Sequence, residues 1–160
     1  MGIVGSGLIF TVVAMAWGGA VHAACAPDAV ELRGPSGQQR FSVEVVETPG
    51  EQAQGLMFRE TLATSAGMLF VFPKPKRAQF WMKNTLIPLD MIFADATGVV
   101  TRVHSDAVPQ DTTGIDGGPG VSFVLEINGG LAKRMGIAGG TQMRHPAIQQ
   151  SVASWPCDGE

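Results

Sequence analysis

Along residues 24–160, hydrophobic residues either alternate with polar residues or form short unbroken blocks. Residues 40–47 and 121–127 alternate, which is typical of a strand with one buried face. Residues 67–72 form an apolar block of strand length, and Pro73 ends it. The predicted strands are residues 40–47, 67–72, 78–83, 89–95, 99–108 and 121–127.

Two short helices interrupt this pattern. Thr48, Pro49 and Glu51 form a capping box with proline at the first helical position, and Gly55 can end that helix one turn later. The second helix is expected over residues 129–135. Lys133 and Arg134 lie in its last turn, where the helix dipole favours cations, and Gly136 can cap its end.

Residues 109–120 contain four glycines and two prolines, so we expect a mobile surface loop there. Many short strands with only two helices favour a mainly β domain over alternating β-α-β units. The predicted architecture is a small β-sandwich or a partly closed barrel.

The first 23 residues are predicted to be a signal peptide. An apolar stretch over residues 8–17 is too short to cross a bilayer, and it is followed by small residues that suit cleavage after Ala23. No Lys or Arg precedes the apolar stretch, so an uncleaved anchor and a misplaced start remain as alternatives. We expect a periplasmic or secreted protein without a membrane span after cleavage.

The chain has two cysteines, Cys25 and Cys157, near the two ends of the mature part. An even number of cysteines in an exported chain favours a disulfide. Closing so long a loop stabilises a fold by up to about 5 kcal/mol in the chain-entropy model. The alternative is a lipoprotein anchored through Cys25, which would leave Cys157 unpaired.

Residues 24–160 have the size of one domain, which we expect to be a monomer. The formal net charge is −3, and the one basic cluster, residues 74–77, is broken by proline. Nothing in the sequence resembles a basic stripe that follows a phosphate backbone, so nucleic acid is not an expected partner.

Candidate chemistry is concentrated in the stretch FWMKNTLIPLD, residues 80–90. If its first half is a strand, Trp81 and Lys83 share the face opposite to the core. Asp90 lies in an apolar strand, as does Glu126 further on, and burying a carboxylate is costly unless it is paired. Arg59 and Lys83 are the candidate partners of Asp90.

These residues either fix the order of the strands and form hydrogen bonds with the backbone of turns, or line a pocket for a small polar ligand. The sequence supports both interpretations equally. In the pocket interpretation the tryptophan stacks on the ligand and the polar groups bind it. The predicted binding residues are Arg59, Trp81, Lys83, Asn84, Thr85, Asp90 and Glu126.

Four blocks, GLMFRETL, AGMLFVF, FWMKNTLIPLDMIFAD and VLEINGGLA, resemble the signature blocks of the family called domain of unknown function 192. The resemblance covers about residues 41–143. It implies a small jelly-roll-like β-sandwich in proteins that are often exported. It implies no activity and transfers no catalytic residue.

The sequence also suggests other functions. A hydrolase acting on a carbohydrate or similar substrate would use Asp90 and Glu126 as paired carboxylates. An interaction module would dock a protein partner of the cell envelope on an apolar patch. Metal binding at His104 and His145, or at the methionines, is disfavoured because no ligand motif occurs and methionine ordinarily fills cores. We assign no cofactor, no metal and no catalytic residue.

Overall fold

The computed structural model describes residues 1–2 and 25–158, so the predicted signal peptide lies almost wholly outside the described residues. Seven strands form one mixed sheet in the order β5-β4-β6-β3-β2-β1-β7. The strands are β1 (Ala29–Gly34), β2 (Gly37–Val46), β3 (Ala66–Phe80), β4 (Leu89–Ala94), β5 (Val100–Ala107), β6 (Ile115–Asn128) and β7 (Gln142–Arg144). The helices are α1 (Pro49–Gln54) and α2 (Leu131–Met135).

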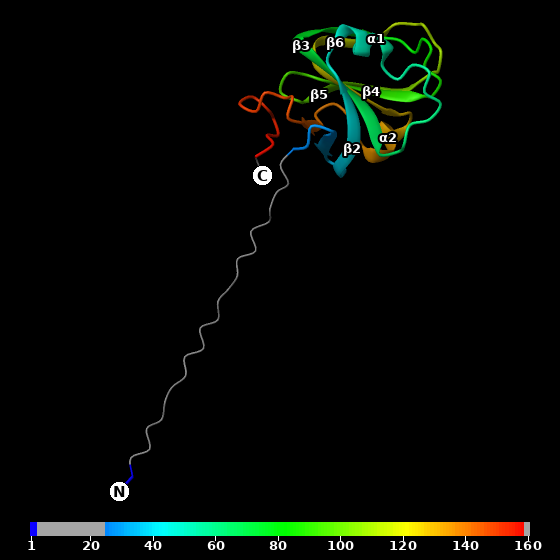
Figure 1. Cartoon of the computed structure of the whole chain (residues 1–160). Helices are drawn as coiled ribbons and strands as arrows, with labels where there is room; N and C mark the ends of the chain where they lie inside the picture. Colours follow the sequence, from blue (N-terminus) through cyan, green and yellow to red (C-terminus); the bar gives the residue numbers. More distant parts are fainter. Residues whose placement is uncertain (3–24, 159–160) are drawn as a thin grey trace.

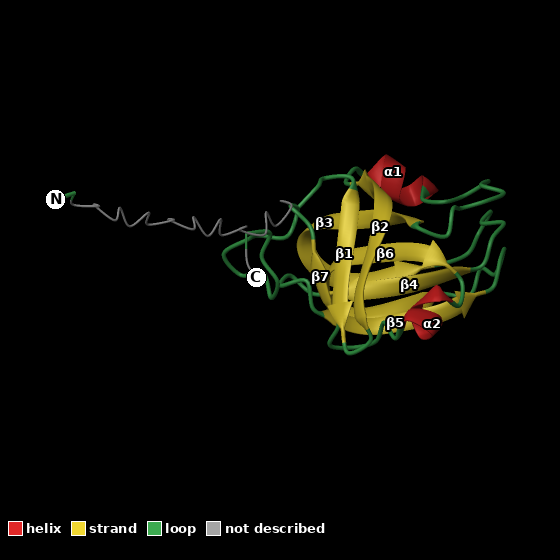
Figure 2. Cartoon of the chain, turned by 90° about the horizontal axis from the view of Figure 1, so that it is seen from below, coloured by secondary structure: helices red, strands yellow, loops and turns green. Residues whose placement is uncertain are grey.

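The sheet is strongly curled, as Figure 2 shows. A bridge between Val99 and Gln142 links the segment before β5 to β7, so the two edges of the sheet meet. Backbone hydrogen bonds from Val100 to Thr141 and from Met143 to Gly98 continue this contact. The prediction of a mainly β fold with two short helices is therefore confirmed, in the form of a partly closed barrel.

Both faces of the central strands are buried. Every residue of β4 is buried, as is every residue of β6 from Val121 to Ile127. Ile92, Leu125 and Leu69 lie on one face, toward the cluster that α2 covers. The other face carries Met68, Met91 and Phe93, together with Leu56 from the segment after α1. The sheet thus divides the interior into an α2 side and an α1 side (Figure 1).

The helix ends follow the sequence prediction. The Thr48 hydroxyl accepts a hydrogen bond from the Glu51 N–H, and the Glu51 carboxylate accepts one from the Thr48 N–H. Gly55, with a φ of 49°, ends α1, and Gly136, with a φ of 67°, ends α2. Both positive φ values suit glycine, which carries no Cβ.

Two predicted boundaries are wrong. Strand β3 does not end at Pro73 but continues to Phe80, because its two prolines lie where pairing to β6 is interrupted between Val71 and Lys76. The missing N–H groups of proline therefore break no ladder bond. The predicted strand 78–83 is consequently the last part of β3, followed by a turn.

The predicted mobile loop over residues 109–120 is also partly wrong, since β6 begins at Ile115 and pairs with the end of β3. Gly117 belongs to the strand because the Phe93 ring packs on its backbone. A Cβ at that position would lie 2.3 Å from the ring. The pattern predicted neither β1 nor β7.

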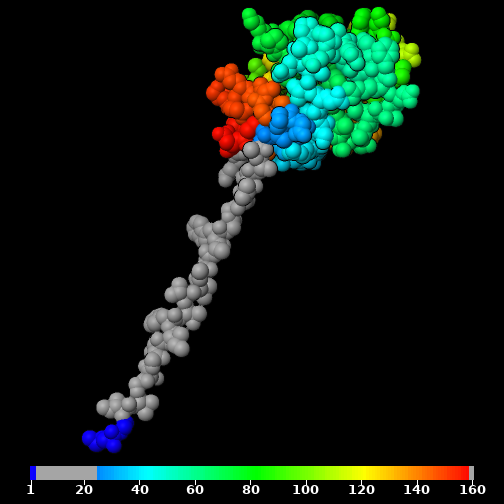
Figure 3. All heavy atoms as spheres, in the orientation of Figure 1, coloured from blue at the N-terminus to red at the C-terminus, as the bar shows by residue number. Residues whose placement is uncertain are grey.

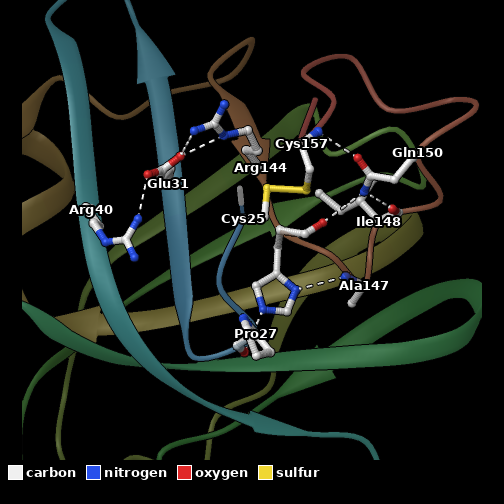
Figure 4. The surroundings of a disulfide bond; sticks show 10 residues. Cys25, Pro27, Glu31, Arg40, Arg144, Ala147, Ile148, Gln150 and Cys157 are labelled. Atoms are coloured by element: carbon white, nitrogen blue, oxygen red, sulfur yellow. Dashed lines mark hydrogen bonds and ion pairs between the residues drawn. A yellow bond between two sulfur atoms is a disulfide. The ribbon is translucent and has the colours of Figure 1, made fainter. Parts of the chain in front are cut away.

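The two ends of the described chain are joined, as predicted, by a disulfide between Cys25 and Cys157 with a Cα–Cα distance of 5.2 Å (Figure 4). Figure 3 shows the segment that follows Cys25 beside the last described residues of the chain. The Cys157 N–H also donates to the side chain of Gln150 at 2.7 Å.

His145 adds a second link between the ends. Its Nδ1 accepts a hydrogen bond from the Ala147 N–H, so Nε2 carries the proton and donates to the Pro27 carbonyl at 3.0 Å. Burial lowers the pKa of this imidazole, because the charged form loses its hydration. The neutral ring therefore ties the C-terminal segment to the residues that follow Cys25.

Charged groups near the disulfide are matched to one another. The Glu31 carboxylate pairs with Arg144 and with the more exposed Arg40 (Figure 4). The Trp155 ring is buried between two guanidinium groups, those of Arg33 and Arg144, each 4.4 Å from the ring centroid. This end of the molecule is closed by covalent, ionic and aromatic contacts.

Candidate functional site

A pocket of about 440 Å³ opens on the α1 side of the sheet. Residues of α1 and of the segment after it form one wall, and residues of β3 form the other. Trp81 and Thr85, from the segment between β3 and β4, complete it, and Glu126 of β6 also lines it. We call it the Glu126 pocket. Its volume lies within the usual range of small-molecule sites.

Glu126 faces the pocket because of strand register. It lies opposite Met68 of β3 and Met91 of β4, and both methionines belong to the apolar cluster on the α1 side. Side chains directly opposite each other on neighbouring strands share one face of a sheet. A carboxyl group thus occupies a position that its neighbours fill with thioethers.

The Glu126 carboxyl has no hydrogen-bond or ion-pair partner among the described residues, and only 4% of the residue is exposed. Burial raises its pKa to about 8, because the ionised form would lose its hydration without gaining a partner. Near pH 7 the group is therefore mostly a neutral carboxylic acid, which can both donate and accept a hydrogen bond.

Aromatic rings form much of the pocket wall. Phe70 and Phe80 meet edge to face with their centroids 5.1 Å apart, and Trp81 at the rim is 49% exposed. Lysine ammonium groups lie against the rings of two of the aromatic side chains. Lys76 Nζ lies 3.7 Å from the Phe72 centroid, and Lys83 Nζ lies 5.2 Å from the Trp81 ring.

The loops beside the pocket hold residues in the left-handed region. Phe58, with a φ of 64°, donates its N–H to the carbonyl of Asn84, which has a φ of 55°. Gln110, with a φ of 61°, donates to the carbonyl of Thr85. Such conformations are costly for residues other than glycine and persist where the surroundings fix them. The loop that supplies Thr85 is thus fixed from two sides.

Asp90 lies on the opposite face of the sheet. It pairs with Ile127, one residue beyond Glu126, so its side chain points to the α2 side. It is fully buried, and its two oxygens accept hydrogen bonds from the N–H groups of Asp106, Gly130 and Ala132 at 2.7–2.9 Å. The carboxylate therefore fixes the start of α2 and the end of β5.

The predicted partners of Asp90 are wrong. Arg59 forms a two-fold ion pair with Glu44 at the surface, which raises the pKa of Arg59 and lowers that of Glu44. Lys83 is exposed and lies over Trp81. Asp90 obtains backbone N–H groups instead, because the turn before α2 offers donors that have no partner within the helix.

The structure brings part of the predicted site together. Trp81, Thr85 and Glu126 line the pocket, and the Asn84 amide contacts the sulfur of Met57, another lining residue. Lys83 adjoins the pocket through Trp81. Arg59 and Asp90 are not among the lining residues.

Sequence reasoning missed the β3 wall of the pocket. Phe70, Phe72 and Lys76 of β3 line it. Alternation within GMLFVF does place Met68, Phe70 and Phe72 on one face, so the signal for two of these residues is in the sequence. Nothing in the sequence indicates that α1 stops short of covering that face.

The paired carboxylates of the hydrolase alternative do not meet, since Asp90 and Glu126 point to opposite faces of the sheet. No group of three or more His, Cys, Asp or Glu side chains suited to a metal ion occurs within residues 25–158. In the same part of the chain, no helix has the length and apolar character needed to span a membrane.

Residues 31–145 match the model of the DUF192 family, domain of unknown function 192, which is described as an uncharacterized ACR. The chain belongs to this family. The comparison with curated proteins found no match.

Two solved structures are similar to this chain. A protein of unknown function from Novosphingobium aromaticivorans is 46% identical, with a TM-score of 0.70 over 72% of this chain and 82% of that one. A protein from Sinorhizobium meliloti 1021, described as a proposed transcription regulator, is 37% identical, with a TM-score of 0.73. That similarity covers 79% of this chain and 98% of the other.

Proposed function

We propose that this protein binds a small organic ligand in the Glu126 pocket. The observation that carries the proposal is the buried carboxyl of Glu126, which faces the pocket without a partner. A methionine, as at the two opposite positions, would stabilise the same packing without the cost of desolvating an acid. The acid therefore serves no evident structural purpose, and a ligand is what would give it a partner.

The lining residues suggest how such a ligand is held. The Glu126 carboxyl forms hydrogen bonds with a polar group at the inner end of the ligand. The apolar or planar part packs on Phe70, Phe80 and Trp81, with Trp81 closing the rim. A few polar groups among apolar walls are the usual composition of small-molecule sites.

We further propose that binding takes place outside the cytoplasm, in the periplasm or after secretion. The disulfide between Cys25 and Cys157 supports this location, because such bonds persist in oxidising compartments. The apolar N-terminal sequence, with its signal-peptide pattern, is the second support.

Although the Sinorhizobium protein is described as a proposed transcription regulator, we do not propose that this protein binds nucleic acid. In the basic cluster of β3, Arg77 pairs with Asp116 at 2.5 Å and Lys76 lies on the Phe72 ring. The chain has a net charge of −3. A surface that binds phosphates needs several free cations along one track.

A fragment library tests the proposal on the oxidised protein. We expect binding fragments to raise the melting temperature and to shift the indole N–H resonance of Trp81, because binding to the folded state stabilises it. The Trp81→Ala variant should weaken binding about tenfold or more. Val152→Ala, which shortens an exposed apolar side chain outside the pocket lining, should leave binding unchanged.

Two results would contradict the proposal. One is a library in which no fragment shifts Trp81 or any other lining residue. The other is a set of fragments that bind as tightly to Trp81→Ala and to Glu126→Leu as to the unaltered protein, because those fragments would then occupy another surface.

A further inference from the structure

Resting on the proposed function, we propose that the ligand of the Glu126 pocket is an organic cation, a molecule with an ammonium group on an apolar or aromatic body. Three features of the pocket support this class: the isolated carboxyl, the aromatic walls and the distribution of charge along the pocket.

The carboxyl lacks what an ammonium group supplies. No N–H or O–H of the described residues donates to Glu126, so both of its oxygens are free to accept. An ammonium group brings several N–H donors and the opposite charge at once. A charged hydrogen bond in a site shielded from water is about twice as strong as a neutral one.

The walls already accommodate ammonium groups. The amines of Lys76 and Lys83 lie against Phe72 and Trp81, both of which line the pocket. Cations are attracted to the faces of aromatic rings, and aromatic cages are a common way to bind ammonium ligands. The rings that hold the protein's own ammonium groups are thus chemically suited to hold that of a ligand.

Charge is separated along the pocket. Among its lining residues, Glu126 and Lys76 are the charged side chains. Lys76 pairs with Val121, five residues from Glu126 along β6, so their backbones are about 16 Å apart at the usual rise of a strand. Lys76 therefore neither neutralises Glu126 nor excludes a cation from its neighbourhood.

A cationic ligand requires the ionised form of Glu126, whereas a neutral ligand is compatible with the acid form. Below pH 8, binding of a cation therefore releases a proton from Glu126, and affinity rises with pH. Around the carboxyl, β3 and β4 contribute Met68 and Met91, and α1 contributes no charged lining residue. Apart from the distant Lys76, no other charged lining residue competes in this titration.

Matched triads of probes test the inference, the first being phenethylammonium, 2-phenylethanol and phenylacetate. Binding to the oxidised protein is measured by titration calorimetry and by the Trp81 indole shift at pH 6, 7 and 8. We expect the ammonium member of each triad to bind at least tenfold more tightly than its partners at pH 8. Its affinity should fall by up to about tenfold for each unit of pH below that.

Substitutions assign the effect to the carboxyl. Glu126→Gln should lose at least tenfold in affinity for phenethylammonium and should abolish the pH dependence. The exposed Glu60→Gln, which removes the same charge elsewhere, should change neither.

The outcomes separate the inference from the proposed function. Two results would contradict the inference that the ligand is a cation: the neutral or anionic members bind more tightly, or the affinity for the ammonium members does not rise with pH. Either result would leave the pocket as a binding site. If neither the triads nor the fragment library shifts the resonances of any lining residue, the proposal that the pocket binds a ligand is contradicted as well.

Discussion

Asp90 and Glu126 are two buried carboxyl groups on neighbouring strands of one sheet, yet their surroundings differ in every respect. On the α2 side, Asp90 accepts three backbone hydrogen bonds. On the α1 side, Glu126 has no partner among the described residues and borders an open pocket. The fold uses the oxygens of Asp90, whereas those of Glu126 have no partner among the described residues, which is the basis of the proposed ligand site.

This contrast separates structure from binding more clearly than burial alone. A buried charge that meets several N–H donors stabilises the segments that supply them. A buried acid without donors lowers stability, so it persists where another requirement maintains it. The number of donors around each carboxyl therefore distinguishes the structural role of Asp90 from the binding role proposed for Glu126.

The largest expected effect is that of Asp90→Ala. Three N–H groups would lose their acceptor inside the protein, so we expect the free energy of unfolding to fall by about 3–5 kcal/mol. Denaturant unfolding measures this loss. The exposed Asp28→Ala is the matched control and should change stability by less than about 0.5 kcal/mol. A comparably small effect at Asp90 would show that its hydrogen bonds do not hold α2.

Glu126→Gln is expected to have a smaller effect of opposite sign, a higher free energy of unfolding near neutral pH. The pKa of Glu126 in the folded state, about 8, exceeds the ordinary value of 4.5. Between these values Glu126 retains in the folded protein a proton that it has released in the unfolded chain, so its contribution to stability falls as pH rises. Replacing the acid by an amide should remove about 2 kcal/mol of this decline between pH 5 and pH 7.

Urea unfolding at several pH values tests this expectation, with Glu60→Gln as the control for a surface carboxylate. The control should keep the decline of the unaltered protein. If Glu126→Gln keeps it too, the carboxyl is ionised in the folded state and must have an unrecognised partner.

The smallest effect is expected at a third carboxylate, Glu44, whose charge is matched by Arg59 at the surface. Both side chains are partly exposed, at 58% and 33%, so solvent weakens their attraction. Arg59→Met should lower the free energy of unfolding by about 0.5 kcal/mol and should leave ligand binding unchanged. A loss of binding in this variant would extend the site beyond the pocket lining.

The sequence predicted much of the fold because most of its signals are local. The capping box at Thr48 and the alternating strand that contains Glu126 each depend on residue types within one segment. The disulfide is an exception, since it was predicted from the even number of cysteines. The continuation of β3 beyond Pro73 and the start of β6 at Ile115 could not be predicted in the same way. They depend on contacts with distant residues, such as the Phe93 ring on Gly117.

The candidate site was predicted in part for a related reason. Alternation shows that Glu126 and Asp90 each lie among apolar neighbours, but it does not show which face each occupies. The register between β4 and β6 decides this, since a shift of one residue would reverse the face. The true partners of Asp90 are backbone N–H groups, which every residue except proline has and which therefore leave no signature in a sequence.

The bond between Cys25 and Cys157 makes the described polypeptide a covalent ring. One proteolytic cut in an exposed connection between strands would open this ring without dividing the molecule. The two fragments would separate on a gel only after reduction. New ends can accordingly be introduced at such a connection once residues 25 and 157 are joined by a short linker, in a circularly permuted protein.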